Sequence, residues 1–515
     1  MSLTQPTSAH SPLATPAAAM RRGRESRLWL SPRGVAILVV ITLLLRWLFS
    51  AIRQLVPDEA YYWVWSRHLA MSYPDHPPMI AYLIRLGTAA AGHRELGVRW
   101  PMGLLAVGMV AILAVVFGRL CRDGRAASFV AVSLLLSPMI AVLGSIATPD
   151  TPACFFQAAA LACALLIFAP GGASLRRGWL WLGFGLLCGL ALDSKYTSVL
   201  LGVAVLLALL WSAEGRRHLR TPWPWLGALA AAAAFSPVIL WNAHHQWESF
   251  RFQLQHGLNN DDEFSPWASA INLGDYVGSQ FMVATPVLFC LAVAVLAVYW
   301  RRRGLPMHQR ILLLTGTLPL VFFAAAAIHK KSNGNWPIFA YLPTTLLIGH
   351  YLAEKPEGQR QFWAEVAVKV ALIGLIVIHL PEALMWMTPR LGNPQWDRLF
   401  GWKELAQKVE SLRGGSAVFA GDYEYASELS FYMPNHPLIW PLPNNRPTLF
   451  DDLPGQVGLQ AFDRVLIVRR RHEEDAPDVV RRWLEPAFTH VQTIDFDQTK
   501  LGRVIRKNAI TLASQ

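Results

Sequence analysis

The sequence predicts a polytopic α-helical membrane protein with about eleven transmembrane helices and a small C-terminal α/β domain outside the cytoplasm. Of its 515 residues, 53% are hydrophobic and only 16% are charged, whereas soluble domains carry about 25% charged residues. Apolar runs of about 12 to 20 residues recur through roughly the first 380 positions, and about 20 apolar residues cross the hydrocarbon core of a bilayer. These observations exclude a soluble enzyme, a disordered scaffold and a secreted disulfide module.

The transmembrane domain is predicted from the positions of the apolar runs, whose shorter members reach across the bilayer with small or weakly polar flanks. The predicted spans are 34–52, 100–118, 127–144, 152–169, 178–192, 197–212, 223–241, 280–300, 310–328, 336–353 and 364–383. The chain then divides into a tail (1–33), a transmembrane domain (34–384) and a C-terminal domain (385–515).

Basic residues give the expected orientation of these spans. They gather in the tail and in every second loop after it, at Arg21, Arg22, Arg24, Arg27, Arg33, Arg119, Arg122, Arg125, Arg176, Arg177, Arg216, Arg217, Arg220, Arg301, Arg302, Arg303, Arg310, Lys355 and Arg360. Cytoplasmic loops carry such an excess, so the tail is expected in the cytoplasm and the C-terminal domain on the other side. The tail lacks the pattern of a cleavable signal, so the first span is expected to stay as an anchor. The net charge of +12 therefore reflects topology and contact with membrane lipids, not nucleic-acid binding.

The C-terminal domain is predicted from a shift toward Pro, Asn, Asp and charged residues after about residue 388. Runs at 417–420 and 464–468 are typical of strands, and the segments 402–412 and 477–484 are typical of helices. The domain contains no cysteine. Those of the chain mostly lie in apolar runs and are expected to be small core residues: Cys121, Cys154, Cys163, Cys188 and Cys290.

The loops expected outside the cytoplasm carry most of the polar side chains that could perform chemistry. In chain order these are Asp58, Glu59, Asp75, His76, Asp150, Lys195, Tyr196, His244, His245, His256, Lys330, Lys331 and Asn335. A charged group at membrane depth is costly and often functional. Because carboxylates, imidazoles and amines from five loops lie on one membrane face, we expect a single extracytoplasmic site.

Each of these residues also has a structural interpretation. Asp58 follows Pro57 at an expected helix start, before an aromatic segment (60–69) expected to lie at the membrane interface, and aspartate is a common helix cap. Asp150 lies just before a predicted span and could likewise only cap that helix. The alternative for Lys195 is a lysine whose side chain extends from apolar surroundings toward water. The basic pair at 330–331 lies where few basic residues are expected, which favours an anionic ligand.

The run 75–78 (Asp-His-Pro-Pro) predicts a rigid elbow, since two prolines prevent a helix from continuing. A stiffly held carboxylate and imidazole could bind a phosphate, a sugar or a divalent metal, and a solvated turn is the alternative. With lysines nearby, a carboxylate base suits transfer from a phosphate-linked donor: the acid accepts a proton, and amines or a metal neutralise the departing phosphate. Nucleotide donors are scarce outside the cytoplasm, so a lipid-linked donor is expected.

The runs 58–67 (Asp-Glu-Ala-Tyr-Tyr-Trp-Val-Trp-Ser-Arg) and 73–78 (Tyr-Pro-Asp-His-Pro-Pro) resemble the first exterior loop of bacterial GT-C glycosyltransferases. These include lipid A aminoarabinose transferases, lipopolysaccharide galacturonosyltransferases and, more distantly, protein O-mannosyltransferases. The galacturonosyltransferase branch is most similar, and Lys195-Tyr196 and the segment from Asn335 to Pro343 also resemble it. The resemblance covers roughly residues 34–350.

The resemblance implies an inverting transfer of a sugar from a polyprenyl-phosphate donor to lipid A, lipopolysaccharide core or another envelope acceptor, on the periplasmic side of the inner membrane. It implies that Asp58 is the base and that Asp150 supports the acceptor or base. The donor phosphate is then expected to be held by Glu59, Asp75, His76, Lys195, Tyr196, Lys330, Lys331 and Asn335. Some relatives bind a divalent metal at the acid matching Asp75, which His244, His245 or His256 could join; aminoarabinose transferases carry lysine where this chain has His76.

Three other functions remain open from the sequence. A transporter or flippase of a lipid-linked anion would use the same charges for binding without chemistry, but such sites lie near the bilayer midplane. A protein O-glycosyltransferase would use another acceptor. An envelope assembly protein would use the C-terminal domain for binding partners.

Overall fold

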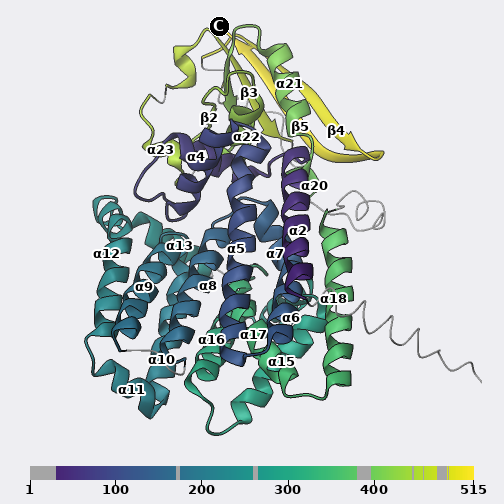
Figure 1. Cartoon of the computed structure of the whole chain (residues 1–515). Coiled ribbons are helices and arrows are strands. Elements are labelled where there is room, and N and C mark those ends of the chain that lie inside the picture. Colours follow the sequence, from purple (N-terminus) through teal and green to yellow (C-terminus); the bar gives the residue numbers. More distant parts are fainter. Residues whose placement is uncertain are drawn as a thin grey trace, which may run out of the picture.

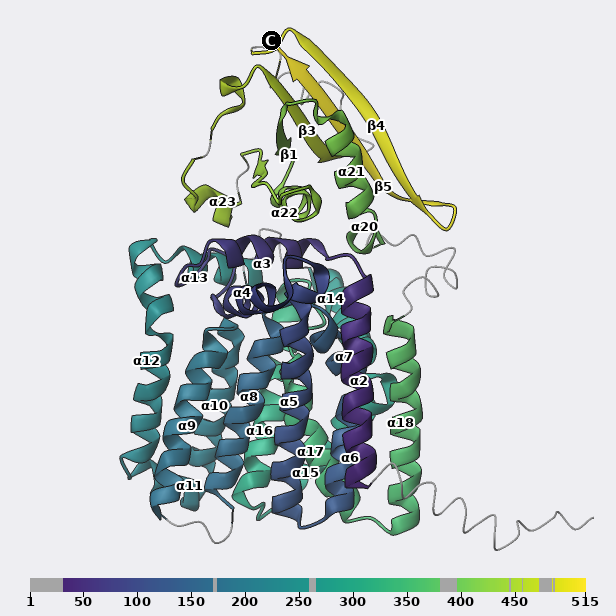
Figure 2. The same cartoon turned by 45° about the horizontal axis from the view of Figure 1, so that its top comes forward.

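The computed structural model describes residues 31–169, 174–258, 265–379, 396–443, 446–455, 457–471, 484 and 487–515. A helical bundle carries a sheet domain on one end (Figures 1 and 2). Among the described helices, five are long and apolar enough to cross a membrane, or up to eight if each bent pair is one span. The mostly helical membrane class is therefore confirmed, whereas the predicted number of about eleven spans is not.

The bundle follows the chain order of the apolar runs. Its helices are α2 (Pro32–Ile52), α5 (Glu95–Cys121), α6 (Gly124–Leu135), α7 (Pro138–Ser145), α8 (Asp150–Ile167), α9 (Ser174–Leu192), α10 (Val199–Trp211), α12 (Trp223–His244), α14 (Pro266–Ala284), α15 (Pro286–Arg301), α16 (Met307–His329), α17 (Tyr341–Ala353) and α18 (Glu357–His379). Shorter helices lie at its two ends: α3 (Pro57–Arg67), α4 (Met79–Ala91), α11 (Ala213–Leu219) and α13 (Glu248–Leu258). Of these, α3, α4 and α13 lie beside the sheet domain, and α11 lies at the opposite end (Figure 2).

Two predicted spans are broken by prolines. The pair α6 and α7 bends by 59° before Pro138, and the pair α14 and α15 bends by 109° before Pro286. In each case a hydroxyl caps the second helix: Ser137 accepts from the Ile140 N–H, and Thr285 accepts from the Leu288 N–H. Proline suits the first position of a helix but cannot continue a preceding one. The spans predicted at 127–144 and 280–300 are therefore each interrupted by a bend between two helices.

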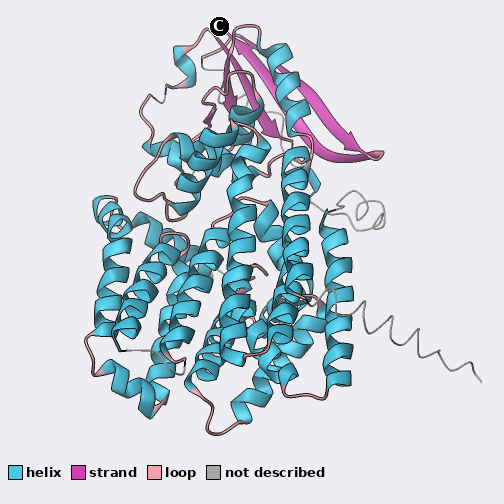
Figure 3. Cartoon of the chain, in the orientation of Figure 1, coloured by secondary structure: helices cyan, strands magenta, loops and turns pink. Residues whose placement is uncertain are grey.

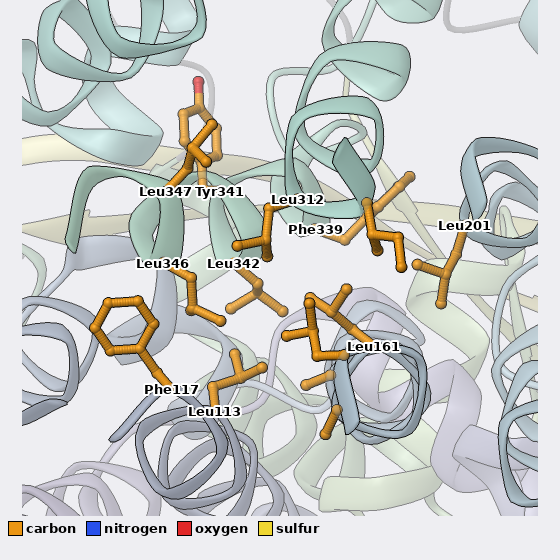
Figure 4. Close-up of a cluster of buried hydrophobic side chains, with 14 of the residues drawn as sticks. Leu113, Phe117, Leu161, Leu201, Leu312, Phe339, Tyr341, Leu342, Leu346 and Leu347 are labelled. Carbon is orange, nitrogen blue, oxygen red and sulfur yellow. The ribbon is translucent and has the colours of Figure 1, made fainter. Parts of the chain in front are cut away.

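The bundle interior is apolar and closely packed. Leu113, Phe117, Leu161, Leu312 and Leu346, from α5, α8, α16 and α17, are fully buried in one cluster (Figure 4). In a bilayer such side chains hold the helices together by close van der Waals packing, since lipid tails are as apolar as leucine. This core holds the helices whose ends carry the polar loops.

The C-terminal domain is built on a five-stranded sheet in the order β2-β1-β3-β5-β4 (Figure 3). Its elements are α20 (Trp396–Leu399), α21 (Trp402–Arg413), β1 (Ala417–Ala420), α22 (Tyr423–Tyr432), β2 (Trp440–Pro441), α23 (Leu449–Asp452), β3 (Arg464–Arg470), β4 (His490–Lys500) and β5 (Arg503–Ser514). β1 pairs in parallel with β2 and β3, while β5 pairs antiparallel with β3 and β4. A small α/β domain is confirmed, with β1, β3 and α21 close to their predicted positions; the predicted helix 477–484 lies outside the described residues except Leu484.

The aromatic helix α3 lies between the bundle and the sheet domain, where α22 covers it (Figure 2). Tyr61, Trp63 and Trp65 are buried, and Trp63 packs against Phe431 of α22. We expected this segment at the lipid interface. Its aromatic rings instead form the apolar contact that seats the sheet domain on the bundle.

A buried ion pair ties three segments together at this end of the bundle. Glu59 of α3 and Arg99 of α5 are both almost completely buried, and the Arg99 Nε lies 2.7 Å from Glu59 Oε1. The same carboxylate accepts the N–H of Val56 at 3.0 Å and that of Ala147 at 2.7 Å. One side chain thus fixes the start of α3, the start of α5 and the loop before α8.

The turn between α9 and α10 carries a buried acid. The carbonyl of Asp193 accepts the N–H of Met79 at 3.0 Å, which joins this turn to α4. The Asp193 side chain is buried, and among the described residues its Oδ1 has no hydrogen-bond partner. Burial raises the pKa of this carboxyl to about 7.

We expect Glu59→Gln to lower the free energy of unfolding by about 3–5 kcal/mol, since it leaves the Arg99 charge buried without a counter-charge. The measurement is the apparent melting temperature of the full chain in detergent. The control is Glu357→Gln, which breaks the exposed pair of Glu357 and Arg125 and is expected to change stability by no more than about 1 kcal/mol. Equal effects of the two variants would contradict this role of Glu59.

We expect the stability of Asp193→Asn, relative to wild type, to increase as the pH rises. An acid with a raised pKa in the folded state favours folding at low pH, and that contribution is lost as the pH rises through about 7. Asparagine does not titrate, so it avoids this loss. The measurement is the difference in melting temperature between the two proteins from about pH 5 to about pH 8, and a constant difference would argue against a buried, titrating Asp193.

Candidate active site

A cavity of about 840 Å³ opens at the end of the bundle next to the sheet domain. One part of its wall is apolar and comes from the bundle helices, α13 and the turn after α16: Leu200, Phe235, Phe250, Phe252, Leu254, Phe322, Phe323 and Trp336. The other part is polar and contains seven of the residues predicted from the sequence: Asp58, Asp75, His76, Asp150, Lys195, Tyr196 and Asn335. The cavity therefore suits a ligand with an apolar part and a charged part.

Asp150 is the centre of a polar cluster drawn from three loops. Its Oδ1 accepts from Lys195 Nζ at 2.6 Å, and its Oδ2 accepts from Asn335 Nδ2 at 3.1 Å. Asp150 is the first residue of α8, but its carboxylate points to these partners and makes no cap. The pair is mostly buried, with 12% of the Lys195 side chain and 10% of the Asp150 side chain exposed.

Asp58 lies at the second position of α3, and its side chain is 44% exposed at the cavity. The helix is capped by Glu59, whose carboxylate accepts the Val56 N–H, so Asp58 is not needed as a cap. Its Oδ2 accepts from Arg398 Nη2 at 3.0 Å, and Arg398 also donates to Glu424 at 3.0 Å. Arg398 and Glu424 both belong to the C-terminal domain.

Asp75 is held from two sides, and its side chain is only 5% exposed. Oδ1 accepts from Arg446 Nη2 at 2.6 Å, and Oδ2 accepts from the Tyr61 hydroxyl at 3.0 Å. Burial raises the pKa of the Asp75 carboxyl, and the adjacent Arg446 guanidinium opposes that shift. On the other side of the elbow, Gln253 of α13 donates to the Asp75 carbonyl.

Tyr196 connects α13 to the cavity. Its hydroxyl lies 2.7 Å from Ser249 Oγ of α13 and 3.5 Å from Ser72 Oγ of the first loop. In each contact either hydroxyl can be the donor, since a phenol both donates and accepts.

Several of the predicted residues do not line the cavity. Glu59 is enclosed by Arg99 and two backbone N–H groups, on the other side of α3 from the cavity. Lys330 follows the end of α16, and Lys331 forms an exposed ion pair with Asp275 at 3.2 Å.

His244 and His245 lie at the end of α12, where the ring of His245 stacks on Trp241. The side chain of His256 lies outside the described residues.

The structure does not bring together the described residues that were expected to hold a divalent metal. In the part of the chain that the structure describes, no three His, Cys, Asp or Glu side chains are placed to hold a metal ion. Both carboxylate oxygens of Asp75 are engaged by Arg446 and Tyr61, and neither His244 nor His245 lines the cavity.

The sequence did not single out four side chains at this site. The cavity is lined by Arg446 and Tyr423 of the C-terminal domain and by Gln253 of α13. Arg398 of the C-terminal domain donates to Asp58. Gln253 lies in the predicted exterior loop that also carries His244, His245 and His256. The arginines had no signal, since a lone arginine in a polar domain is ordinary.

Comparisons with known proteins agree with this architecture. Residues 75–241 match the model of a family described as dolichyl-phosphate-mannose-protein mannosyltransferase. The lipid A galacturonosyltransferase RgtD of Rhizobium johnstonii is 28% identical over 381 residues, which cover 71% of this chain and 74% of that protein.

Among solved structures, ArnT from Cupriavidus metallidurans superposes with a TM-score of 0.62 in the apo state, at 16% identity over 93% of this chain and 97% of that one. ArnT bound to undecaprenyl phosphate also gives 0.62, at 14% identity over 93% and 98% of the two chains. These likenesses show that the chain has an ArnT-like fold. The resemblance to GT-C glycosyltransferases is thus confirmed: residues 75–241 match a GT-C family domain, and the chain is similar in sequence to a lipid A galacturonosyltransferase and in fold to ArnT.

Proposed function

We propose that the chain is an inverting glycosyltransferase that moves a sugar from a polyprenyl-phosphate donor to lipid A or the lipopolysaccharide core at the periplasmic face of the bacterial inner membrane. The observation that carries the proposal is the divided cavity, in which an apolar wall meets Asp58, Asp150 and Lys195. A lipid-linked phosphate has the same division between tail and head. The likeness to a protein named lipid A galacturonosyltransferase and to an ArnT structure with undecaprenyl phosphate supports it.

The donor fits the cavity with its lipid tail along the apolar wall of Phe235, Phe322 and Phe323. Its phosphate then lies at Lys195, whose ammonium donates one hydrogen bond to Asp150 and keeps further N–H donors for the phosphate. An ammonium in a mostly buried position interacts with an anion more strongly than one in bulk water. His76 and Tyr196 supply further polar contacts at the same end.

In the reaction, Asp58 accepts the proton of the acceptor hydroxyl as that oxygen attacks the anomeric carbon. The bond between the anomeric carbon and the phosphate oxygen breaks at the same time, and its electron pair leaves with the phosphate. Lys195 stabilises the charge that grows on the departing phosphate. Attack opposite to the leaving group inverts the configuration at the anomeric carbon.

The periplasmic side is proposed from the distribution of basic residues. The basic loops join α5 to α6, α15 to α16 and α17 to α18, and with α11 they lie at the end of the bundle away from the sheet domain (Figure 1). Cytoplasmic loops carry the excess of arginine and lysine. The cavity and the sheet domain then face the periplasm, where acceptors such as lipid A are exposed.

We expect Asp58→Asn to lower kcat by about 10²–10⁴ while the affinity for undecaprenyl phosphate changes little, because the amide keeps the shape of the side chain but accepts no proton. The measurement is transfer of radiolabelled galacturonate from undecaprenyl phosphate to lipid A by the full chain in proteoliposomes. Galacturonate is the first sugar to test because of the relative's name.

The control is Asp275→Asn, at an exposed aspartate paired with Lys331 away from the cavity, which is expected to transfer at the wild-type rate. Equal transfer by Asp58→Asn and wild type would remove Asp58 from the mechanism. Movement of the lipid-linked sugar across the bilayer without any glycosyl product would favour a flippase, and a labelled protein in place of lipid A would favour a protein O-glycosyltransferase.

A further inference from the structure

We propose that the C-terminal domain is part of the transfer site, where Arg446 and Arg398 act as positioning residues that neutralise and hold Asp75 and Asp58 beside the donor phosphate. The inference rests on the proposed function for the identity of the ligand. It extends that function by giving the sheet domain a direct role at the cavity.

Arg446 lies at the boundary between the C-terminal domain and the helical bundle, and contacts hold its guanidinium from both sides. Its guanidinium lies 4.3 Å from the ring centre of Tyr423 in α22 and 5.5 Å from that of Phe252 in α13. Nη1 donates to the Tyr423 hydroxyl at 2.9 Å, and Nη2 donates to Asp75 Oδ1 at 2.6 Å. A planar guanidinium with aromatic contacts and directional hydrogen bonds is strongly oriented, so Arg446 sets the position of the Asp75 carboxylate.

The segment that follows Arg446 holds the same acid a second time. The N–H of Leu449 donates to the Tyr61 hydroxyl at 2.8 Å, and that hydroxyl donates to Asp75 Oδ2 at 3.0 Å. Both oxygens of Asp75 are therefore oriented by the stretch from Arg446 to Leu449. Since His76 follows directly, the sheet domain also fixes the cavity-lining elbow.

Arg398 repeats this arrangement at the proposed base. It donates to Asp58 from Nη2 and to Glu424 from Nη1, each at 3.0 Å. Glu424 belongs to α22, so Asp58 is tied to the same helix that carries Tyr423. The guanidinium holds one oxygen of the Asp58 carboxylate at the edge of the cavity that Asp58 lines.

These contacts balance the charge of the cavity. Among its described lining residues the carboxylates are Asp58, Asp75 and Asp150, and each is paired with a cation. Only Lys195 comes from the bundle. Without the two arginines, Asp58 and Asp75 would be unneutralised next to an anionic phosphate and would repel it. The C-terminal domain thus allows an acidic cavity to accept an anionic donor.

We expect Arg446→Gln to weaken the binding of undecaprenyl phosphate to the full chain in detergent by about tenfold at pH 8, with a smaller loss for Arg398→Gln, because Asp58 is more exposed than Asp75 and better screened by water. The control is Arg471→Gln, which removes an arginine of the same domain that pairs with Asp495 and Asp497 on β4. The control is expected to bind as wild type.

Two further measurements separate charge from structure. Arg446 opposes the upward shift in the pKa of Asp75, so its removal raises that pKa further; the loss of affinity relative to wild type should then shrink as the pH falls and Asp75 takes up a proton. The double variant Asp75→Asn/Arg446→Gln should bind close to wild type and lose this pH dependence. The titratable and charged groups that face Asp75 are Arg446, Tyr61, Tyr62, His76, Asp58 and Tyr423.

Unchanged binding in Arg446→Gln, or a loss that is equal at every pH and persists in the double variant, would overturn the inference. Wild-type protein that binds undecaprenyl phosphate but transfers no sugar would overturn the proposed function and leave the binding comparison decisive for Arg446. Absence of wild-type binding would overturn both.

Discussion

The ion pair of Glu59 and Arg99 is the contact on which the geometry of the cavity depends. The carboxylate joins the start of α3, the start of α5 and the loop before α8, and it is closed off from water. Asp58 precedes Glu59, and Asp150 lies three residues after Ala147, so the one carboxylate determines the separation of the proposed base and the residue that holds Lys195. A buried pair costs desolvation and is not a strong source of stability. Its value here is that it fixes the relative positions of three segments.

Much of the site could be predicted because topology follows from hydropathy. Once the basic loops assign one end of the bundle to the cytoplasm, Asp58, Asp75, Asp150, Lys195 and Asn335 are all expected at the other end, and the cavity collects them. Finer detail could not be predicted in the same way. Adjacent residues on a helix point about 100° apart, so Glu59 turns to Arg99 while its neighbour Asp58 faces the cavity. Lys331, an apparent exception to the charge rule, pairs with Asp275 of α14.

The failures in the fold have local causes. A window of average hydropathy does not register that Ser137-Pro138 and Thr285-Pro286 each start a new helix, although a capping hydroxyl before a proline is a recognisable signal. The arginines are different, because no local pattern marks them. Arg398 contacts Asp58 at a sequence separation of 340 residues, and Arg446 contacts Asp75 at a separation of 371 residues. Such long-range contacts form only when the sheet domain packs on α3.

That seating explains why α3 is so rich in aromatic residues. Tyr61, Trp63 and Trp65 provide the apolar area that packs against α22 and α23. This packing places Arg398 and Arg446 next to Asp58 and Asp75. Charge pairs alone would give a weak and salt-sensitive attachment. An apolar contact beside the pairs does not depend on salt, and it shields the Asp75 carboxylate, whose side chain is only 5% exposed. The same aromatic helix therefore holds the acid Asp58 on one side and, by seating the sheet domain, supplies the cation that neutralises it.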